Sequence, residues 1–143
     1  WLTQLYTRLI CDEFYGTTPE HGYGYGQDED QGQLGAWYVM AAVGLFDVQG
    51  GTNITPSYQI GSPKFRKNTI KLDPRYYSGK TLVIETENNA PDHYYVQSAT
   101  LNGQPLEDCW FYRREIINGG HLKLQMDSTP NTRWGIASMP HSK

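Results

Sequence analysis

Residues 31–46 limit the possible folds of this chain more than any other stretch. Their sequence, QGQLGAWYVMAAVGLF, predicts a helix with apolar side chains on nearly every side. A helix of this kind has to be covered all round, and one amphipathic neighbour does not cover it. The sequence therefore predicts that further helices belong around this segment. It also predicts that the first 50 residues leave an apolar surface exposed when they stand alone.

Another helix is predicted at the start of the chain. Apolar residues recur there every three or four positions, as on one helix face: Leu2, Leu5, Tyr6, Leu9, Ile10 and Phe14. Gly16 suits the position just after a helix, and Pro19 follows where a helix cannot continue. Residues 1–50 are therefore predicted to be helical.

The pattern changes from helix to strand after Gly50-Gly51. Strands are predicted at residues 64–72, 81–86, 94–101 and 121–126, with turn residues between them. Asn102-Gly103 is the residue pair typical of a two-residue type I′ hairpin. A short helical turn is predicted over residues 113–117. Together these patterns indicate an α+β fold, with an antiparallel unit of five or six strands in residues 51–143.

Composition excludes two classes of partner. The net charge of −3 gives no basic face for nucleic acid. No apolar run approaches the ~20 residues needed to span a membrane.

Three consecutive carboxylates, Asp28, Glu29 and Asp30, precede the apolar helix in GYGYGQDEDQGQLGAWY. The glycines before them imitate a dinucleotide-binding loop, but acids would repel a pyrophosphate there. An EF-hand is excluded because Val39 stands where that loop needs a bidentate glutamate. Asp30 and Gln33 have the spacing of a helix capping box, which would use one carboxylate. A functional acid cluster and a simple helix cap both remain open on the residues alone.

The acidic stretch resembles the signature of glycoside hydrolase family 92, the calcium-dependent exo-acting α-mannosidases. The similarity continues in the same order along the chain, in GLFDVQGG, YQIGSPKF, TIKLDPRYYSGKTLVI, YYVQSATLNGQPL, INGGHLKLQM and PNTRWG. In one respect the chain departs from the family pattern, because Gln27 stands where the family usually has the glycine before the first aspartate. The resemblance covers almost the whole chain.

This resemblance implies a fold and a chemistry. Residues 1–50 would be the last helices of an (α/α)6 catalytic barrel, and residues 51–143 the C-terminal antiparallel β region. Asp28 and Asp30 match the aspartates given the general-base role, and Asp30 would also contribute to a Ca²⁺ site. Glu29 is expected to have a structural role. The general acid and most calcium ligands would lie upstream of Trp1, in a missing part of the same enzyme.

The resemblance thus predicts the C-terminal part of an inverting exo-α-mannosidase, acting on a mannose-containing glycan with α-1,2 linkages. The parent would be secreted or periplasmic, and this chain alone would be inactive. The alternative is a β-rich carbohydrate-binding or structural module without catalysis, whose acids only cap a helix.

Overall fold

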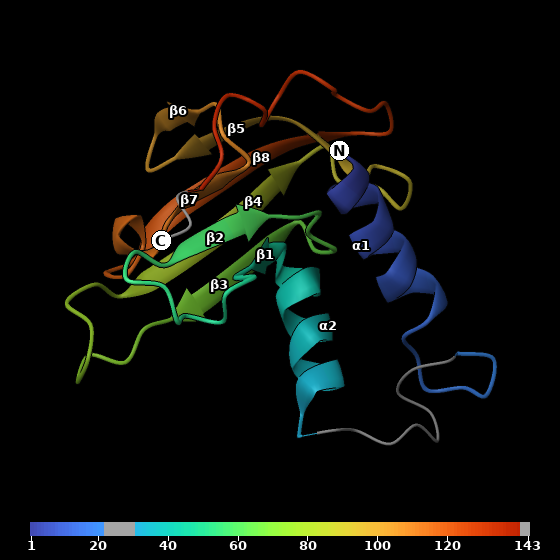
Figure 1. The fold of residues 1–143 in the computed structure, drawn as a ribbon, viewed down its shortest axis with the longest axis horizontal. Helices are drawn as coiled ribbons and strands as arrows, with labels where there is room; N and C mark the ends of the chain where they lie inside the picture. The colour runs from blue at the N-terminus through green and yellow to red at the C-terminus, as the bar shows by residue number, and fades with distance from the viewer. Residues whose placement is uncertain (22–30, 141–143) are drawn as a thin grey trace.

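The computed structural model describes residues 1–21 and 31–140, in which two helices stand beside two β-sheets (Figure 1). The helices are α1 (Leu2–Glu13) and α2 (Gln33–Val43). The strands are β1 (Leu45–Phe46), β2 (Ser57–Ile60), β3 (Lys67–Lys71), β4 (Thr81–Glu87), β5 (Tyr95–Leu101), β6 (Gln104–Leu106), β7 (Trp110–Tyr112) and β8 (Gly120–Asp127). A 3₁₀ turn, η1 (Arg113–Glu115), precedes β8 and confirms the predicted helical turn.

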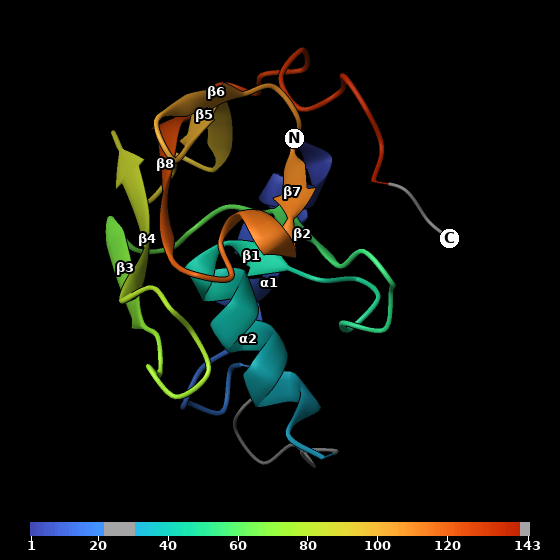
Figure 2. The same cartoon turned by 90° about the vertical axis from the view of Figure 1, so that its left-hand side faces the viewer.

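The larger sheet has five strands in the order β3-β4-β8-β5-β6 and carries most of the core (Figure 2). Its middle strand, β8, alternates as predicted: Leu122, Leu124 and Met126 are fully buried, while His121 and Lys123 lie on the other face. In a strand with neighbours on both sides and one covered face, the apolar side chains are removed from water. This burial is the main contribution to the stability of the sheet.

The prediction of an antiparallel unit is wrong in one respect, because β4 and β8 run parallel. The remaining strand pairs of this sheet are antiparallel. Parallel neighbours need a long connection between them, and here the chain passes through β5, β6 and β7 before β8 inserts between β4 and β5. Alternation within a strand shows which face is buried, but it carries no information about the direction of the neighbouring strand.

The hairpin predicted from Asn102-Gly103 is confirmed. Both residues have positive φ, 52° and 81°, as a type I′ turn requires, and Leu101 pairs directly with Gln104. The strands predicted around it also form, with small shifts at their ends.

A second sheet, β1-β2-β7, is absent from the sequence-based prediction. It also explains why α2 ends earlier than the apolar run suggests. Gly44 ends the helix in the left-handed conformation, with φ 87°, and its amide donates to the carbonyls of Met40 and Ala41. Leu45 and Phe46 then pair with β2 instead of continuing the helix.

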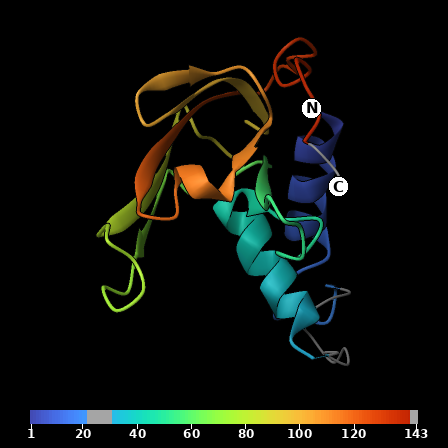
Figure 3. The same cartoon turned by 60° about the vertical axis from the view of Figure 1, so that its left-hand side comes forward.

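Helix α1 forms as predicted but packs through its polar side. Its buried residues are Gln4, Arg8 and Cys11, whereas Leu2, Tyr6 and Phe14 of the predicted apolar face are exposed. Figures 1 and 3 show α1 and α2 side by side, extending away from the five-stranded sheet. On the predicted apolar face of α1, Leu5, Leu9 and Ile10 are half-buried, while Leu2, Tyr6 and Phe14 keep about half of their surface exposed.

The same holds for part of α2. Val39 is 59% exposed and Tyr6 on α1 is 58% exposed, although both belong to helices whose sequences predict burial. This confirms the prediction of an exposed apolar surface in the first 50 residues. Within the described part of the chain, no helix has the length and apolar content needed to cross a bilayer.

Candidate functional site

Asp28, Glu29 and Asp30, which we call the acidic segment, belong to the part of the chain that connects the two helices. Asp28, Glu29 and Asp30 lie outside the described residues, so the structure gives no geometry for the predicted catalytic pair or for the predicted calcium ligand. Their position in the chain is nevertheless fixed: they follow α1 and end three residues before Gln33, the first residue of α2. In Figure 1 the C-terminal end of α1 and the N-terminal end of α2 lie at the same end of the helix pair, away from the sheets.

Helix α2 does not begin as a capping box would require. Its N-cap is Gly32, in the left-handed conformation with φ 79°, and no side chain among the described residues caps the helix there. Gln31 also has positive φ, at 59°. A residue without a side chain is suited to this backbone shape. The N-cap position of α2 is therefore Gly32, and not Asp30 as the predicted capping box would require.

Three aromatic rings join the two ends of the connection between the helices, and we call Tyr15, Trp37 and Tyr38 the aromatic clamp. The ring of Tyr15 lies 5.3 Å from that of Trp37, at an interplanar angle of 17°. It lies 5.1 Å from the ring of Tyr38, at 30°. All three side chains are half-buried. Trp37 and Tyr38 thus pack against the ring of Tyr15.

Lys64 adds a second tie between the helices. Its ammonium group forms an ion pair with Asp12 on α1 and lies 5.7 Å from the ring centroid of Tyr38 on α2. Burial disfavours the charged ammonium group, but the hydrogen bond and charge of Asp12 outweigh it, so the pKa of Lys64 lies above its ordinary value. Lys64 therefore remains charged at neutral pH and holds both helices.

The loop that carries Lys64 anchors the helices to the sheet. Arg8, only 4% exposed, donates from Nη1 to the carbonyl of Pro63 at 2.7 Å. The amide of Lys64 donates to the carbonyl of Ala42 at 3.0 Å, and Asn89, after β4, donates to the same Pro63 carbonyl at 3.3 Å. The sequence IGSPK thereby connects α1, α2 and the five-stranded sheet at one place.

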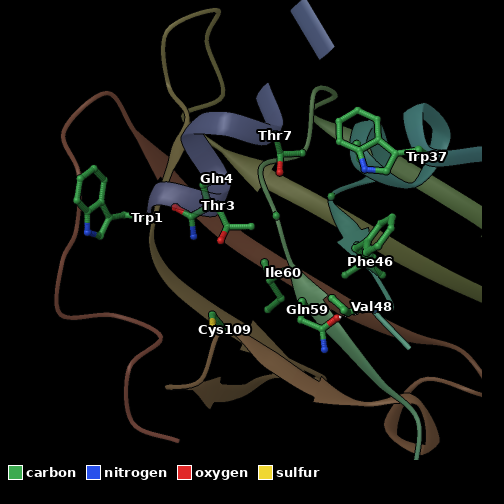
Figure 4. A pocket seen from close by; sticks show the side chains of 14 residues that line it. Trp1, Thr3, Gln4, Thr7, Trp37, Phe46, Val48, Gln59, Ile60 and Cys109 are labelled. Atoms are coloured by element: carbon green, nitrogen blue, oxygen red, sulfur yellow. Dashed lines mark hydrogen bonds between the residues drawn. The ribbon is translucent and has the colours of Figure 1, made fainter. Parts of the chain in front are cut away.

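Two hollows flank the helix pair. One, of about 440 Å³, lies beside the aromatic clamp and is lined by Ile10, Phe14, Tyr15, Gln33, Leu34 and Trp37. The other, of about 360 Å³, lies between the start of α1 and the end of α2. Figure 4 shows Trp1, which precedes α1, with Gln4 and Thr7 of α1 on one side of it, and Ile60 of β2 and Cys109 on another. Only the first is at the helix ends that border the acidic segment.

The described residues do not form a metal site by themselves. In residues 1–21 and 31–140 no three His, Cys, Asp or Glu side chains are grouped closely enough to hold an ion. Carboxylate oxygens such as those at positions 28–30 are ligands that Ca²⁺ accepts, but a full set of six to eight oxygens has to come from elsewhere.

Most of the chain matches one family of enzymes. The model of the glycosyl hydrolase family 92 catalytic domain matches residues 1–128. The chain therefore belongs to glycosyl hydrolase family 92. An uncharacterized secreted glycosidase of the fungus Arthroderma benhamiae is 32% identical over 110 residues, which cover 76% of this chain and 13% of that protein.

Solved structures agree with this assignment. The family GH92 inverting mannosidase BT2199 of Bacteroides thetaiotaomicron is 40% identical, with a TM-score of 0.78 over 94% of this chain and 17% of that one. The α-mannosidase BT3965 of the same organism is 28% identical, with a TM-score of 0.79 and the same coverage. The chain thus spans about a sixth of the length of these two enzymes.

Tyr15 and Lys64 were missed by sequence reasoning. Lys64 lies within YQIGSPKF, one of the stretches that resemble the family, but nothing in that pattern shows that its partners are Asp12 and Tyr38. Tyr15 stands outside the apolar spacing of α1, so periodicity gave it no role.

Proposed function

We propose that this chain is the C-terminal part of an inverting exo-α-mannosidase, and that Asp28 and Asp30 supply its general base. The observation that carries the proposal is the 40% identity, across 94% of the chain, to a structure named as an inverting mannosidase. Residues 1–50 are then the last helices of an (α/α)6 barrel. A glycan with terminal α-1,2-linked mannose is the proposed substrate.

Inversion requires two carboxyl groups with opposite tasks. One protonates the leaving oxygen, while the other takes a proton from the water that attacks the anomeric carbon from the opposite side. The two groups stand roughly 6.5–9.5 Å apart, which leaves room for that water. Asp28 and Asp30 are assigned to the second task, and an upstream glutamate to the first. Two carboxylates this near in sequence remain ionised more easily beside a cation, which supports a Ca²⁺ site that includes Asp30.

The exposed apolar residues support an upstream part that packs on the helix pair. Leu2, Tyr6 and Phe14 line one side of α1, and Val39 lies on α2. Full burial of an apolar side chain gains roughly 1.5–3 kcal/mol. Because these side chains are 45–59% exposed, a covering layer of helices would recover about half of that gain at each of them. The parent enzyme is proposed to be secreted or periplasmic, in line with the relative that is named as secreted.

The experiment is to assay the full-length enzyme on α-1,2-mannobiose and to follow the product by NMR. An inverting enzyme releases mannose first as the β-anomer, and a calcium chelator should reduce the rate. Release of the α-anomer first, or no hydrolysis of any α-mannobiose, contradicts the proposal. If the enzyme hydrolyses only mannobioses with other α linkages, the proposed α-1,2 specificity is wrong but the proposed mannosidase activity stands.

A further inference from the structure

We infer that residues 129–138, which we call the C-terminal strap, are a conformational device that locks the two β-sheets together. Strands β6 and β7 keep their places only while the strap is docked on them. The family model matches residues 1–128, so the strap lies beyond the matched region. The inference is independent of the proposed function, because it concerns the β region and none of the predicted catalytic residues.

The strap is fixed first to β5. In Figure 1 the red end of the chain turns back after β8, toward β5 and β7. Nδ2 of Asn131 donates to the carbonyl of Gln97 on β5 at 3.0 Å, and Nε2 of Gln97 donates to the carbonyl of Thr129 at 2.8 Å. Oδ1 of Asn131 accepts the amides of Arg133 and Trp134, at 3.0 and 3.1 Å. The side chain of Asn131 therefore both attaches the strap to β5 and shapes the turn before Trp134.

Trp134 places the strap in the core. It is 8% exposed and belongs to the same buried cluster as Leu122 and Leu124 of β8. Its Nε1 donates to the carbonyl of Leu106, the last residue of β6, at 2.9 Å. A buried tryptophan removes a large apolar surface from water, and its N–H usually finds a hydrogen-bond partner there. Trp134 meets both conditions, so the strap contributes to the core that the five-stranded sheet covers.

The other end of the strap is bonded beside β7, in the small sheet. The amide of Ser138 donates to Oδ1 of Asp108 at 2.8 Å, and Nε1 of Trp110 on β7 donates to the carbonyl of Ser138 at 3.2 Å. Gly135 allows a close approach of the two backbones, because its φ is 81° and a Cβ there would lie 2.7 Å from Cβ of Cys109. The strap thus binds both sheets.

The strands that the strap holds are short edge strands. Strand β6 is an edge of the five-stranded sheet, β7 is an edge of the small sheet, and each has three residues. An edge strand pairs with one neighbour, so its other side depends on what else covers it. Regions with few buried contacts open first when a protein fluctuates. Loss of the strap should therefore free β6 and β7 together, although they belong to different sheets, and should leave β3 at the far edge unaffected.

The test is amide hydrogen exchange in the full-length enzyme with Trp134→Ala. We expect exchange over residues 104–106 and 110–112 to accelerate by about 10²-fold or more, as truncation of a buried tryptophan implies. Exchange over β3 should stay near that of wild type. Ile136→Ala is the matched control, because Ile136 belongs to the same strap but is 72% exposed, and it should change neither region.

Asn131→Ala provides a milder arm if Trp134→Ala does not fold. It keeps the indole and removes the hydrogen bonds to β5 and to the turn, so exchange over residues 104–106 and 110–112 should rise about tenfold. Its control is Thr132→Ala, at the exposed neighbouring position. Equal exchange in Asn131→Ala and Thr132→Ala overturns the inference, and so does acceleration of β6 without β7. Acceleration of β3 by the same factor also overturns it, because that result shows a general loss of stability.

Discussion

Arg8 donates a hydrogen bond of 2.7 Å to the backbone carbonyl of Pro63, across 55 positions of sequence. A guanidinium buried on the inner face of a helix is unusual, because a charge loses its hydration there unless it is paired. Here the carbonyl of Pro63 and the carboxylate of Asp12, 3.8 Å from Nε, provide that pairing. The contact explains why α1 turns its polar side toward the sheets.

Arg8→Ala should therefore destabilise the fold. Hydrogen bonds to charged groups contribute about 1.5–3 kcal/mol, and we expect a loss of free energy of unfolding in that range. Urea unfolding of wild type and variant measures it. Arg75→Ala is the matched control, because Arg75 makes an exposed ion pair with Asp73 and should show no measurable loss. Equal stability of the two variants would contradict the role given to Arg8.

Gly44→Ala should cost more than Gly103→Ala. Both glycines have positive φ, 87° and 81°, so replacement by alanine costs about 1–2 kcal/mol of unfolding free energy at either position. A Cβ at Gly44 would lie 2.3 Å from Cγ of Pro63, whereas no atom lies within 4 Å of one at Gly103. The extra loss of unfolding free energy in Gly44→Ala, compared with Gly103→Ala, reports how tightly the end of α2 packs against residues 60–63. If both variants lose the same amount, that packing is looser than described.

Stability should depend on pH through Lys64. Because its pKa is raised above the ordinary 10.5, its contribution is fully present below that pH and is lost as the pH rises through the folded value. The gap in melting temperature between wild type and Lys64→Met should thus stay constant from neutral pH upward and shrink only above pH 10.5. A gap that already shrinks near neutral pH would show that Lys64 is not held by Asp12 as described.

The isolated chain should associate with itself and lack mannosidase activity. Exposed Leu2, Tyr6 and Val39 drive association, and the proposed general acid lies upstream. Sedimentation at increasing concentration tests the first expectation, and mannobiose assays with and without calcium test the second. Tyr6→Ser combined with Val39→Ser should reduce association. A monomer at high concentration contradicts the role of this surface, and turnover by the chain alone contradicts the missing acid.

The sequence predicted the parts of the fold that local patterns determine. Strand β8 follows from the alternation of Leu122, Leu124 and Met126, and the hairpin from Asn102-Gly103. Strand β1 has two residues, Leu45 and Phe46, which is too few for any periodic signal, so the small sheet was missed.

Partners distant in sequence account for the other errors. The parallel pairing of β4 with β8 depends on tertiary assembly, as does the burial of Arg8 against a loop more than fifty residues away. At the candidate site, the resemblance predicted Asp28 and Asp30 from their motif, and these two residues lie outside the described part of the chain. It gave no indication of Tyr15 and Lys64, because a stack and an ion pair between segments leave no mark on local sequence.

The most direct measurement of the central claim is the turnover of the full-length enzyme with Asp28→Asn or Asp30→Asn, next to Glu29→Gln as the control of equal chemistry. We expect each aspartate variant to lose about 10²–10⁴-fold in kcat, as removal of a positioned proton-transfer group does. Melting temperatures should stay near that of wild type, and Glu29→Gln should retain most activity. Near-normal turnover in both aspartate variants would contradict the claim that this chain carries the general base.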